Sequence, residues 1–375
     1  MSSRFFLISN KVKKFNKVLK VDGDKSISIR WLFLASQATG ISKAKNLLRS
    51  EDVLSAIECL KKLGIKIKLT NKDCTVFGRG INGFKFKKNI ILNAGNSGTV
   101  GRLILPLLIK SPYKIKIVGD KSLSKRDFSR ITEPLKMFGA NIVSKKKKLP
   151  VLISGSTFLR PIIYEEKLGS AQCKSAVMLA ALKAPGITKI KAKKSRNHTE
   201  IFFKNLNIPI KVINKKKYDL IEVKGHSNFN GFNYNVPGDI SSCSFFLVLT
   251  ILSKDSRLTI KNVNINDTRT GVIKILKKMN AYILYKNKKN YKGEEIADIY
   301  VESTKNIKSI NCPMSLNSSA IDEFLIIFLV AARAKGISTF KSLGELNMKE
   351  SPRLNIAINI LRKIGVKVLR TGNDI

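Results

Sequence analysis

The sequence predicts an α/β chain made of two similar halves, and three features of its 375 residues support this fold class. A short pattern recurs along the chain, in which the end of an amphipathic helix is followed by a Gly or Asn turn and a β-rich run. A second pattern, Gly-Asp before an apolar helical stretch, occurs twice. Polar clusters rich in Lys, Arg, Ser and Gly stand where the helical stretches begin.

The helix–turn–strand pattern occurs five times. Gly or Asn occupies the position where a helix needs a left-handed residue at its C-terminal end. The copies are Leu60–Ile67, Leu135–Ile142, Phe203–Ile210, Leu276–Ile283 and Leu361–Val368. Their spacing is too long for a solenoid repeat and fits a module of about two helices and several strands. Chance similarity between common helix–glycine–strand junctions is the alternative interpretation.

The Gly-Asp pattern relates Val21–Ser26 to Val236–Ser241, about three modules further along. The first half therefore contains three modules. The second half shows two copies before Ile375, the last residue of the sequence. Symmetry predicts a sixth module, so we expect the chain to be truncated at its C-terminal end.

The bulk composition excludes several classes of protein. Hydrophobic residues make up 43% of the chain, which is enough for a sizeable core. The apolar run 324–332 is too short to span a bilayer, and no secretory signal is readable at the N-terminus. The five cysteines form no C-x-x-C pair and there are only two histidines, so we expect neither a disulfide framework nor a metal centre. A reducing, cytoplasmic location follows from this cysteine usage.

The formal net charge of +44 allows two interpretations. One is a nucleic-acid-binding protein. The other is a general lysine bias, because runs such as 145–148 and 215–217 fall where loops are expected. No aromatic residues alternate with these runs, as a base-stacking surface would require. We favour the lysine bias, and the positive field would attract anionic metabolites.

The first polar cluster begins a helix. Asp24 is a plausible N-cap of this helix and Gly40 a plausible C-cap. Ser26 and Arg30 are four residues apart and share one face. Lys25 lies in the first turn, where a cation opposes the helix dipole unless an anion binds there.

Similar clusters follow along the chain. Each alone is more often a helix cap or a solvated turn, but together they supply groups that bind phosphates and carboxylates. Asp322 and Glu350 are candidate acid and base carboxylates. The clusters span 93–102, 119–126, 169–175, 195–200, 236–243, 320–323 and 345–353.

The order and spacing of these motifs resemble one family over nearly the whole chain. GDKSISIR, GNSGT, GDKSLSKR, SAQCKS, SRNHTE, PGDISS, AIDE and ELNMKES-R occur in the order found in EPSP synthases. The resemblance implies a two-domain enolpyruvyl transferase fold of repeated βαβαββ modules, with the sixth module missing. It implies a first domain over 21–234, inserted into a second domain that combines 1–20 with 235–375.

The resemblance also implies a reaction. The enolpyruvyl group of phosphoenolpyruvate is transferred to the 5-hydroxyl of 3-phosphoshikimate and phosphate is released. This step of the shikimate pathway leads to chorismate and the aromatic amino acids. The implied enzyme is a cytoplasmic monomer without cofactor or metal, and its partners are these two small molecules rather than nucleic acid or membrane.

Residue roles follow by similarity. Asp322 is the implied base, Glu350 the implied proton donor, and Lys25 contacts both substrates. The implied phosphoenolpyruvate site comprises Lys25, Gly98, Arg126, Gln172 and Arg353. The implied 3-phosphoshikimate site comprises Lys25, Ser26, Arg30, Ser170, Ala171, Gln172, Ser195, Arg196, Asp322, Glu345 and Lys349.

Some positions depart from the family pattern. Ile29, Asn197, Asp127 and Pro352 replace the usual His, Asp, Pro and Asp. Pro352 restricts the residue before it, although proline at a helix start is tolerated. The family's glycine-rich end with its Asp-His-Arg segment and terminal Lys is not present, so we expect the printed chain to be inactive or impaired.

Three alternatives stay open beside this interpretation. One is an inactive remnant of the enzyme, and another is a nucleic-acid-binding protein. The third is the sister reaction on UDP-N-acetylglucosamine. That family uses a Cys-bearing loop near the Arg126 region, and no cysteine lies between Cys74 and Cys173.

Overall fold

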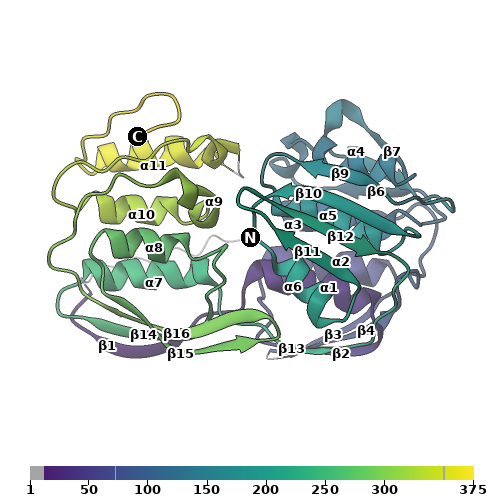
Figure 1. Ribbon diagram of the computed structural model, residues 1–375, viewed down its shortest axis with the longest axis horizontal. Coiled ribbons are helices and arrows are strands. Elements are labelled where there is room, and N and C mark those ends of the chain that lie inside the picture. The colour runs from purple at the N-terminus through teal and green to yellow at the C-terminus, as the bar shows by residue number, and fades with distance from the viewer. Residues whose placement is uncertain (1–11, 72, 349–350) are drawn as a thin grey trace, which may run out of the picture.

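The computed structural model describes residues 12–71, 73–348 and 351–375 and shows two halves lying side by side (Figure 1). Within these residues there are four sheets of four strands each. Three of the sheets belong to one half. The fourth sheet lies below a stack of helices in the other half.

The four sheets share one strand order. In each, the first two strands are parallel, and the other two are antiparallel to their neighbours. The sheets are β13-β2-β4-β3, β5-β6-β8-β7, β9-β10-β12-β11 and β1-β14-β16-β15. With the intervening helices each forms a βαβαββ module, which confirms the predicted fold class.

The first three modules have the following elements. Module 1 contains α1 (Lys25–Gln37), β2 (Thr39–Lys45), α2 (Glu51–Lys62), β3 (Lys66–Leu69), β4 (Asp73–Arg79) and β13 (Asn233–Asn235). Module 2 contains β5 (Ile91–Asn93), α3 (Gly98–Leu103), η1 (Leu105–Leu108), β6 (Ile115–Val118), η2 (Leu123–Lys125), α4 (Ser129–Met137), β7 (Asn141–Ser144), η3 (Lys145–Lys147) and β8 (Val151–Ser154). Module 3 contains β9 (Ile163–Glu166), α5 (Ala171–Ala181), β10 (Ile187–Lys193), α6 (His198–Asn205), β11 (Ile210–Asn214) and β12 (Tyr218–Lys224).

The other half has one complete module and a helical segment. Module 4 contains β1 (Asn16–Lys20), α7 (Ile240–Leu252), β14 (Arg257–Asn264), α8 (Gly271–Lys278), β15 (Ile283–Tyr291) and β16 (Glu294–Glu302). The helical segment contains η4 (Met314–Leu316), α9 (Asn317–Ala320), α10 (Phe324–Ala331), η5 (Gly344–Met348) and α11 (Arg353–Lys363).

The two halves exchange a strand. β1 precedes α1 in the chain but pairs with β14 in module 4, whereas β13 precedes α7 but pairs with β2 in module 1. The chain therefore crosses between the halves twice. The crossings meet at an isolated bridge between Gly23 and Gly238, and a Cβ on Gly23 would lie 2.0 Å from the Asn46 carbonyl oxygen. Glycine is required there because the backbones approach so closely.

Helix boundaries follow most of the sequence signals. The Asp24 side chain accepts a hydrogen bond of 2.9 Å from the Ile27 amide, as expected of an N-cap. The expected C-cap at Gly40 is wrong, because α1 ends at Gln37 and Ala38 already has an extended ψ of 157°. Gly40 instead has a φ of 98° within β2.

The turn residues of the five predicted junctions all have positive φ. They are Gly64 at 83°, Gly139 at 112°, Asn207 at 54°, Asn280 at 76° and Gly365 at 85°. Strands follow the first four, namely β3, β7, β11 and β15. The fifth prediction is partly wrong, because residues 366–368 form no strand. The sheets of the four modules supply a neighbouring strand at each junction, and no assigned strand lies beside 366–368 among the described residues.

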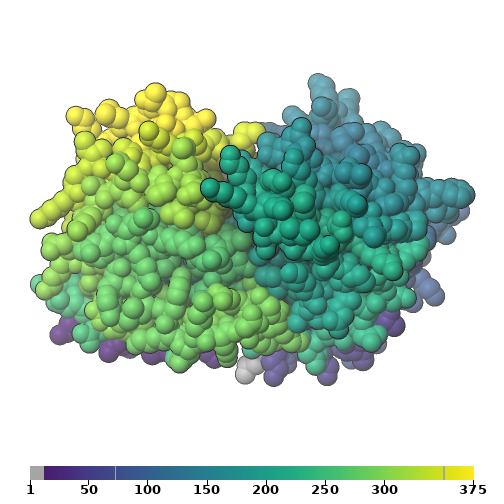
Figure 2. Space-filling view, viewed as in Figure 1, coloured from purple at the N-terminus to yellow at the C-terminus, as the bar shows by residue number. Residues whose placement is uncertain are grey.

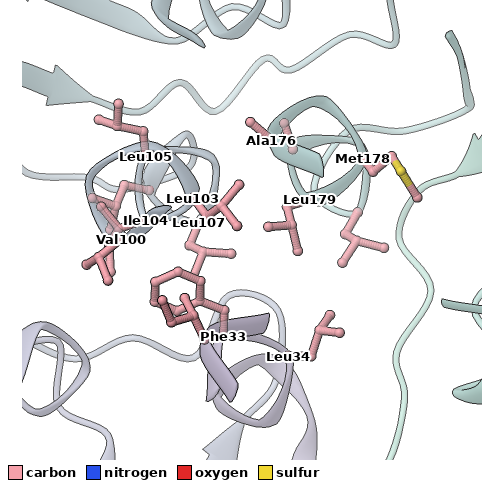
Figure 3. Packing of buried hydrophobic residues seen from close by; sticks show 14 of the residues in the cluster. Phe33, Leu34, Val100, Leu103, Ile104, Leu105, Leu107, Ala176, Met178 and Leu179 are labelled. Carbon is pink, nitrogen blue, oxygen red and sulfur yellow. The ribbon is translucent and has the colours of Figure 1, made fainter. Parts of the chain in front are cut away.

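The buried hydrophobic side chains separate into two clusters. One includes residues from Ile27 to Val236, and the other includes Val21 and residues from Ile240 to Leu361. In the first cluster α1, α3 and α5 pack together, with Phe33 and Leu34 facing Leu103, Leu107 and Leu179 (Figure 3). This packing fixes the starts of all three helices relative to one another. No helix in the described part of the chain is long and apolar enough to cross a membrane.

Candidate functional site

Most of the expected site residues lie at helix starts and in adjoining turns. Lys25, Ala171 and Arg353 are the first residues of α1, α5 and α11, where backbone amides favour anions. The space-filling view shows a notch where the yellow and teal atoms of the two halves meet (Figure 2). Contacts between the halves place several of these groups together, as described below.

Arg30 is held in a buried network of hydroxyl groups. Its side chain is 4% exposed, and it donates from Nε to Thr199 Oγ1 at 2.9 Å and from Nη2 to Ser175 Oγ at 3.1 Å. Nη1 donates to the backbone carbonyl of Ser26 at 3.0 Å. Burial, together with nearby Arg196, lowers the pKa of Arg30 to about 10. The group is therefore still a cation at neutral pH, fixed by three elements of the first half.

Gly98 lies between two guanidinium groups. A Cβ at this position would lie 2.8 Å from Arg126 Nη1 and 2.9 Å from Arg102 Nη1. Arg102 donates to Gln172 Oε1 at 2.7 Å, and Gln172 donates to Thr99 Oγ1 at 2.9 Å. This cluster joins α3, η2 and α5 and presents two cations beside an open backbone. Such a geometry fits a carboxylate or phosphate group.

Module 3 contributes a buried ion pair and a hydroxyl group. Lys174 Nζ lies 2.6 Å from Glu200 Oε1, and both side chains are buried. The pair links the first turns of α5 and α6. Ser170 caps α5 by accepting a 3.3 Å hydrogen bond from the Cys173 amide. The Ser195 hydroxyl is buried and has no hydrogen-bond partner among the described residues.

Asp322 connects the two halves. One carboxylate oxygen forms an ion pair with Arg196 Nη2 of the first half, and the other lies 3.2 Å from Arg353 Nη1 of the second half. The side chains of Arg196 and Asp322 are 20% and 25% exposed, so both are reachable from solvent. The two guanidinium groups hold the carboxylate at the meeting point of the halves.

Lys25 stands at the crossing between the halves. Its backbone amide donates to Asp239 Oδ2 at 3.1 Å, and its ammonium lies 3.6 Å from Asp52 Oδ2. Its side chain is 47% exposed. Beneath it, the guanidinium of Arg269 is buried and lies 3.5 Å from Asp24 Oδ2.

Three further expected residues come from the segment 345–350. Glu345 is exposed at the start of η5, while Lys349 and Glu350 lie outside the described residues. Pro352 is the N-cap of α11, a position at which the missing N–H leaves no helical hydrogen bond unmade. The Ile356 amide bonds to the Pro352 carbonyl at 3.1 Å, so the substitution is compatible with the helix that begins at Arg353.

Some residues of the arrangement were not predicted. Arg102 stands within the 93–102 motif but received no role, although its spacing from Gly98 places both on one helix face. Ser175 and Thr199 also lie in quoted motifs. Arg269 lies outside every motif and had no distinguishing signal. No group of three His, Cys, Asp or Glu arranged to hold a metal ion occurs within 12–71, 73–348 and 351–375.

Comparisons with known proteins identify the family of the chain. The family model described as EPSP synthase (3-phosphoshikimate 1-carboxyvinyltransferase) matches residues 9–375. The chain is 37% identical over 364 residues to the 3-phosphoshikimate 1-carboxyvinyltransferase of Bacillus cytotoxicus, covering 96% of this chain and 84% of the relative. It is 42% identical over 357 residues to that of Ruthia magnifica, covering 94% and 81%.

A solved structure is also similar. The EPSP synthase of Acinetobacter baumannii superposes with a TM-score of 0.85 at 34% identity, covering 96% of this chain and 81% of that one. These matches do not by themselves support the truncation that the module count predicts, and that expectation stays a prediction.

Proposed function

The chain belongs to the EPSP synthase family, and we propose that it transfers the enolpyruvyl group of phosphoenolpyruvate to the 5-hydroxyl of 3-phosphoshikimate. One observation carries the assignment to this site. Asp322 lies between Arg196 and Arg353, which come from opposite halves of the molecule. An ionised carboxylate among cations is what proton removal from a substrate with a phosphate and a carboxylate requires.

The proposed phosphoenolpyruvate site centres on Gly98. Arg126 and Arg102 flank the glycine, and Gln172 links Arg102 to Thr99. Their charge and hydrogen-bond donors suit the phosphate and carboxylate of this substrate. Arg353 and Lys25 complete the proposed set.

The proposed 3-phosphoshikimate site lies at the starts of α1, α5 and α6. Arg30 is pre-organised by its bonds to Thr199 and Ser175, and the buried Ser195 hydroxyl is available for a ligand hydrogen bond. The remaining proposed residues are Lys25, Ser26, Ser170, Ala171, Gln172, Arg196, Asp322, Glu345 and Lys349.

The chemistry follows from these assignments. Asp322 accepts the proton of the 5-hydroxyl as the hydroxyl oxygen bonds to the second carbon of phosphoenolpyruvate. Glu350 donates a proton to the methylene carbon in the same step. The Glu350 carboxylate then takes back one proton from the methyl group of the tetrahedral adduct as the C–O bond to phosphate breaks, which forms the double bond of the enol ether. Lys25 and the arginines stabilise the oxyanions throughout. The assignment of Glu350 rests on family similarity alone.

We propose the domain division 21–234 and 1–20 with 235–375. The two separate buried clusters support it except beside the crossings, where Val21 packs in the second cluster and Val236 in the first, and the exchange of β1 and β13 supports it as well. The proposed site takes residues from both domains, so their relative placement governs catalysis.

The test uses the purified chain with phosphoenolpyruvate and 3-phosphoshikimate. Calorimetric binding of 3-phosphoshikimate alone is expected, together with slow phosphate release that needs both substrates, because the predicted loss of the sixth module impairs turnover. Phosphate release without 3-phosphoshikimate, or the absence of both turnover and binding, would contradict the proposal. Asp255→Asn serves as a control for substitution of a site carboxylate, because Asp255 is exposed and belongs to none of the site motifs.

We further propose that the protein is a cytoplasmic monomer that binds small anions rather than nucleic acid. The five cysteines are buried free thiols, which a reducing compartment preserves. Light scattering should give a mass near 41.8 kDa. Retention on DNA that falls steeply with salt but survives saturating 3-phosphoshikimate would favour the nucleic-acid alternative.

A further inference from the structure

Arg269 is a buried cation surrounded by three carboxylates. Its guanidinium is 2% exposed and lies 3.5 Å from Asp24, 3.7 Å from Asp239 and 3.7 Å from Glu323. Nη2 also donates to Ser241 Oγ at 2.7 Å, and the Ser241 hydroxyl bonds to Glu323. The planar fork of arginine holds five donors in a fixed geometry that can bond separated acceptors, whereas the ammonium of lysine is a compact point charge with three donors.

Each carboxylate belongs to a different structural element near the proposed site. Asp24 caps α1, whose first residue is Lys25. Asp239 caps α7 and also accepts the backbone amide of Lys25. Glu323 directly follows Asp322 in the chain. One guanidinium thus pairs with the two aspartates beside Lys25 and with the residue next to the proposed base, Asp322.

These contacts cross between the halves. Asp24 lies with α1 in module 1, whereas Arg269, Asp239 and Glu323 belong to the other half. Gly23 and Gly238, immediately before the two aspartates, form the bridge at which the chain crossings meet. The Arg269 cluster therefore lies at the junction about which the two halves are oriented.

The charges in the cluster depend on Arg269. Burial by itself raises the pKa of Asp24, but Arg269, His198, the Ile27 amide and Arg196 together outweigh it, with Arg269 the largest of the four, and the net pKa is lowered. Burial and neighbouring Asp24 raise the pKa of Asp239 despite Arg269, and burial raises that of Glu323. Without the guanidinium, three buried carboxylates would lose their counter-charge and would have to move or take up protons.

We propose that Arg269 is a positioning residue that fixes Lys25 of the first half opposite Asp322 of the second. The inference rests on the proposed function, since these two residues act together only in that reaction. A displacement of about 1 Å in such a pair lowers turnover by about 10²-fold. Arg269 touches neither substrate in this proposal.

The test compares Arg269→Lys with Arg257→Lys. Arg257 starts β14 in the same half, is 61% exposed and pairs with Glu302, so its substitution controls for the general loss of a guanidinium. Arg269→Lys keeps the charge but loses the fork. We expect kcat to fall by about 10²-fold. The affinity for 3-phosphoshikimate should change by less than about threefold, because the Arg30 side chain keeps its bonds to Thr199 and Ser175 in the first half.

Activity is expressed per 3-phosphoshikimate-binding site measured by calorimetry, so loss of folded protein does not count as loss of turnover. Arg269→Lys should also be less than additive with Asp24→Asn in kcat, because both disrupt the same contact. Full kcat per binding site in Arg269→Lys, or strict additivity, would overturn the inference. Absence of turnover and binding in the unsubstituted chain would instead reject the proposed function and the inference with it.

Discussion

The leading helices of the two halves, α1 and α7, differ in how completely they are covered. Both begin after Gly-Asp and both are capped by the aspartate. Residues 27–37 of α1 are all buried, whereas on α7 Phe245 is 65% exposed and Leu249 is 40% exposed. The sequence of α7 is the more apolar of the two, so neighbouring modules, rather than the helix itself, decide its burial.

The same contrast separates the groups of the proposed site. Arg30, Arg102 and Arg126 stand on the three-module core of the first half, where α1, α3 and α5 pack against one another. Asp322 lies in the turn before α10 and Arg353 begins α11, beyond the one complete module of the second half. The comparison predicts a rigid cationic half and a more easily perturbed carboxylate half.

The largest expected effect is on stability. Phe33→Ala in α1 should lower the free energy of unfolding by about 3–5 kcal/mol, because a fully buried ring leaves a cavity. Leu249→Ala in α7 should lower it by less than about 1 kcal/mol, because the side chain is partly solvated already. Urea unfolding of both variants checks this. An equal loss would show that the outer face of α7 is covered in solution.

The next effect concerns catalysis by the second half. Asp322→Ala should reduce kcat by about 10²-fold or more, because the hydroxyl proton then has no acceptor. The affinity for 3-phosphoshikimate should change much less, since Arg30 and its network lie in the other half. Stopped-flow phosphate release and calorimetry separate the two quantities. An unchanged kcat would remove Asp322 from the mechanism.

A smaller effect is expected in the first half. Gly98→Ala places a methyl group against Arg102 and Arg126, so one guanidinium must shift. The KM for phosphoenolpyruvate should rise by about tenfold, the typical cost of one misplaced methyl group. The dissociation constant of 3-phosphoshikimate should stay the same. Gly80→Ala is a control for an extra methyl group, since its nearest neighbour would be 3.6 Å away, although its φ of 79° adds strain.

The smallest expected effect is a pH dependence within the first half. Burial, with a contribution from Lys110, lowers the pKa of Lys183 from 10.5 to about 7. The unfolded chain therefore binds more protons between pH 7 and 10.5, so this group makes stability rise with pH in that window. Lys183→Met should remove the rise and raise Tm at pH 7 by a few degrees. Exposed Lys215→Met should leave the pH profile unchanged, and a Lys183→Met profile that still rises would contradict the assignment.

The sequence predicted the parts of the fold that local signals determine. Asp24 caps α1, and four of the five Gly or Asn junctions lead into strands because helix and turn chemistry act within a few residues. Gly40 failed as a C-cap because an earlier residue, Ala38, already leaves the helix. The run at 366–368 failed because a strand needs a neighbouring strand, which local sequence does not supply.

Long-range contacts limited the prediction of the site. The clusters around Gly98 and Arg30 combine motifs whose residue types already suggested anion binding. Arg269 could not be predicted, since its carboxylate partners lie far away in the chain and meet only after the halves are placed. A single arginine in the polar turn before α8 has no local property that marks it as buried.

The exchange of β1 and β13 has a consequence for the order of synthesis. Among the described residues β1 precedes every other strand in the chain, yet its partner β14 is made only after the entire first half. At ordinary elongation rates the delay is on the order of ten to fifty seconds. During this interval β1 leaves the ribosome without a sheet, while the first half still lacks its own last strand, β13. The nascent chain must therefore carry an unpaired strand edge until β14 emerges. Such an edge can pair with another chain unless a chaperone covers it.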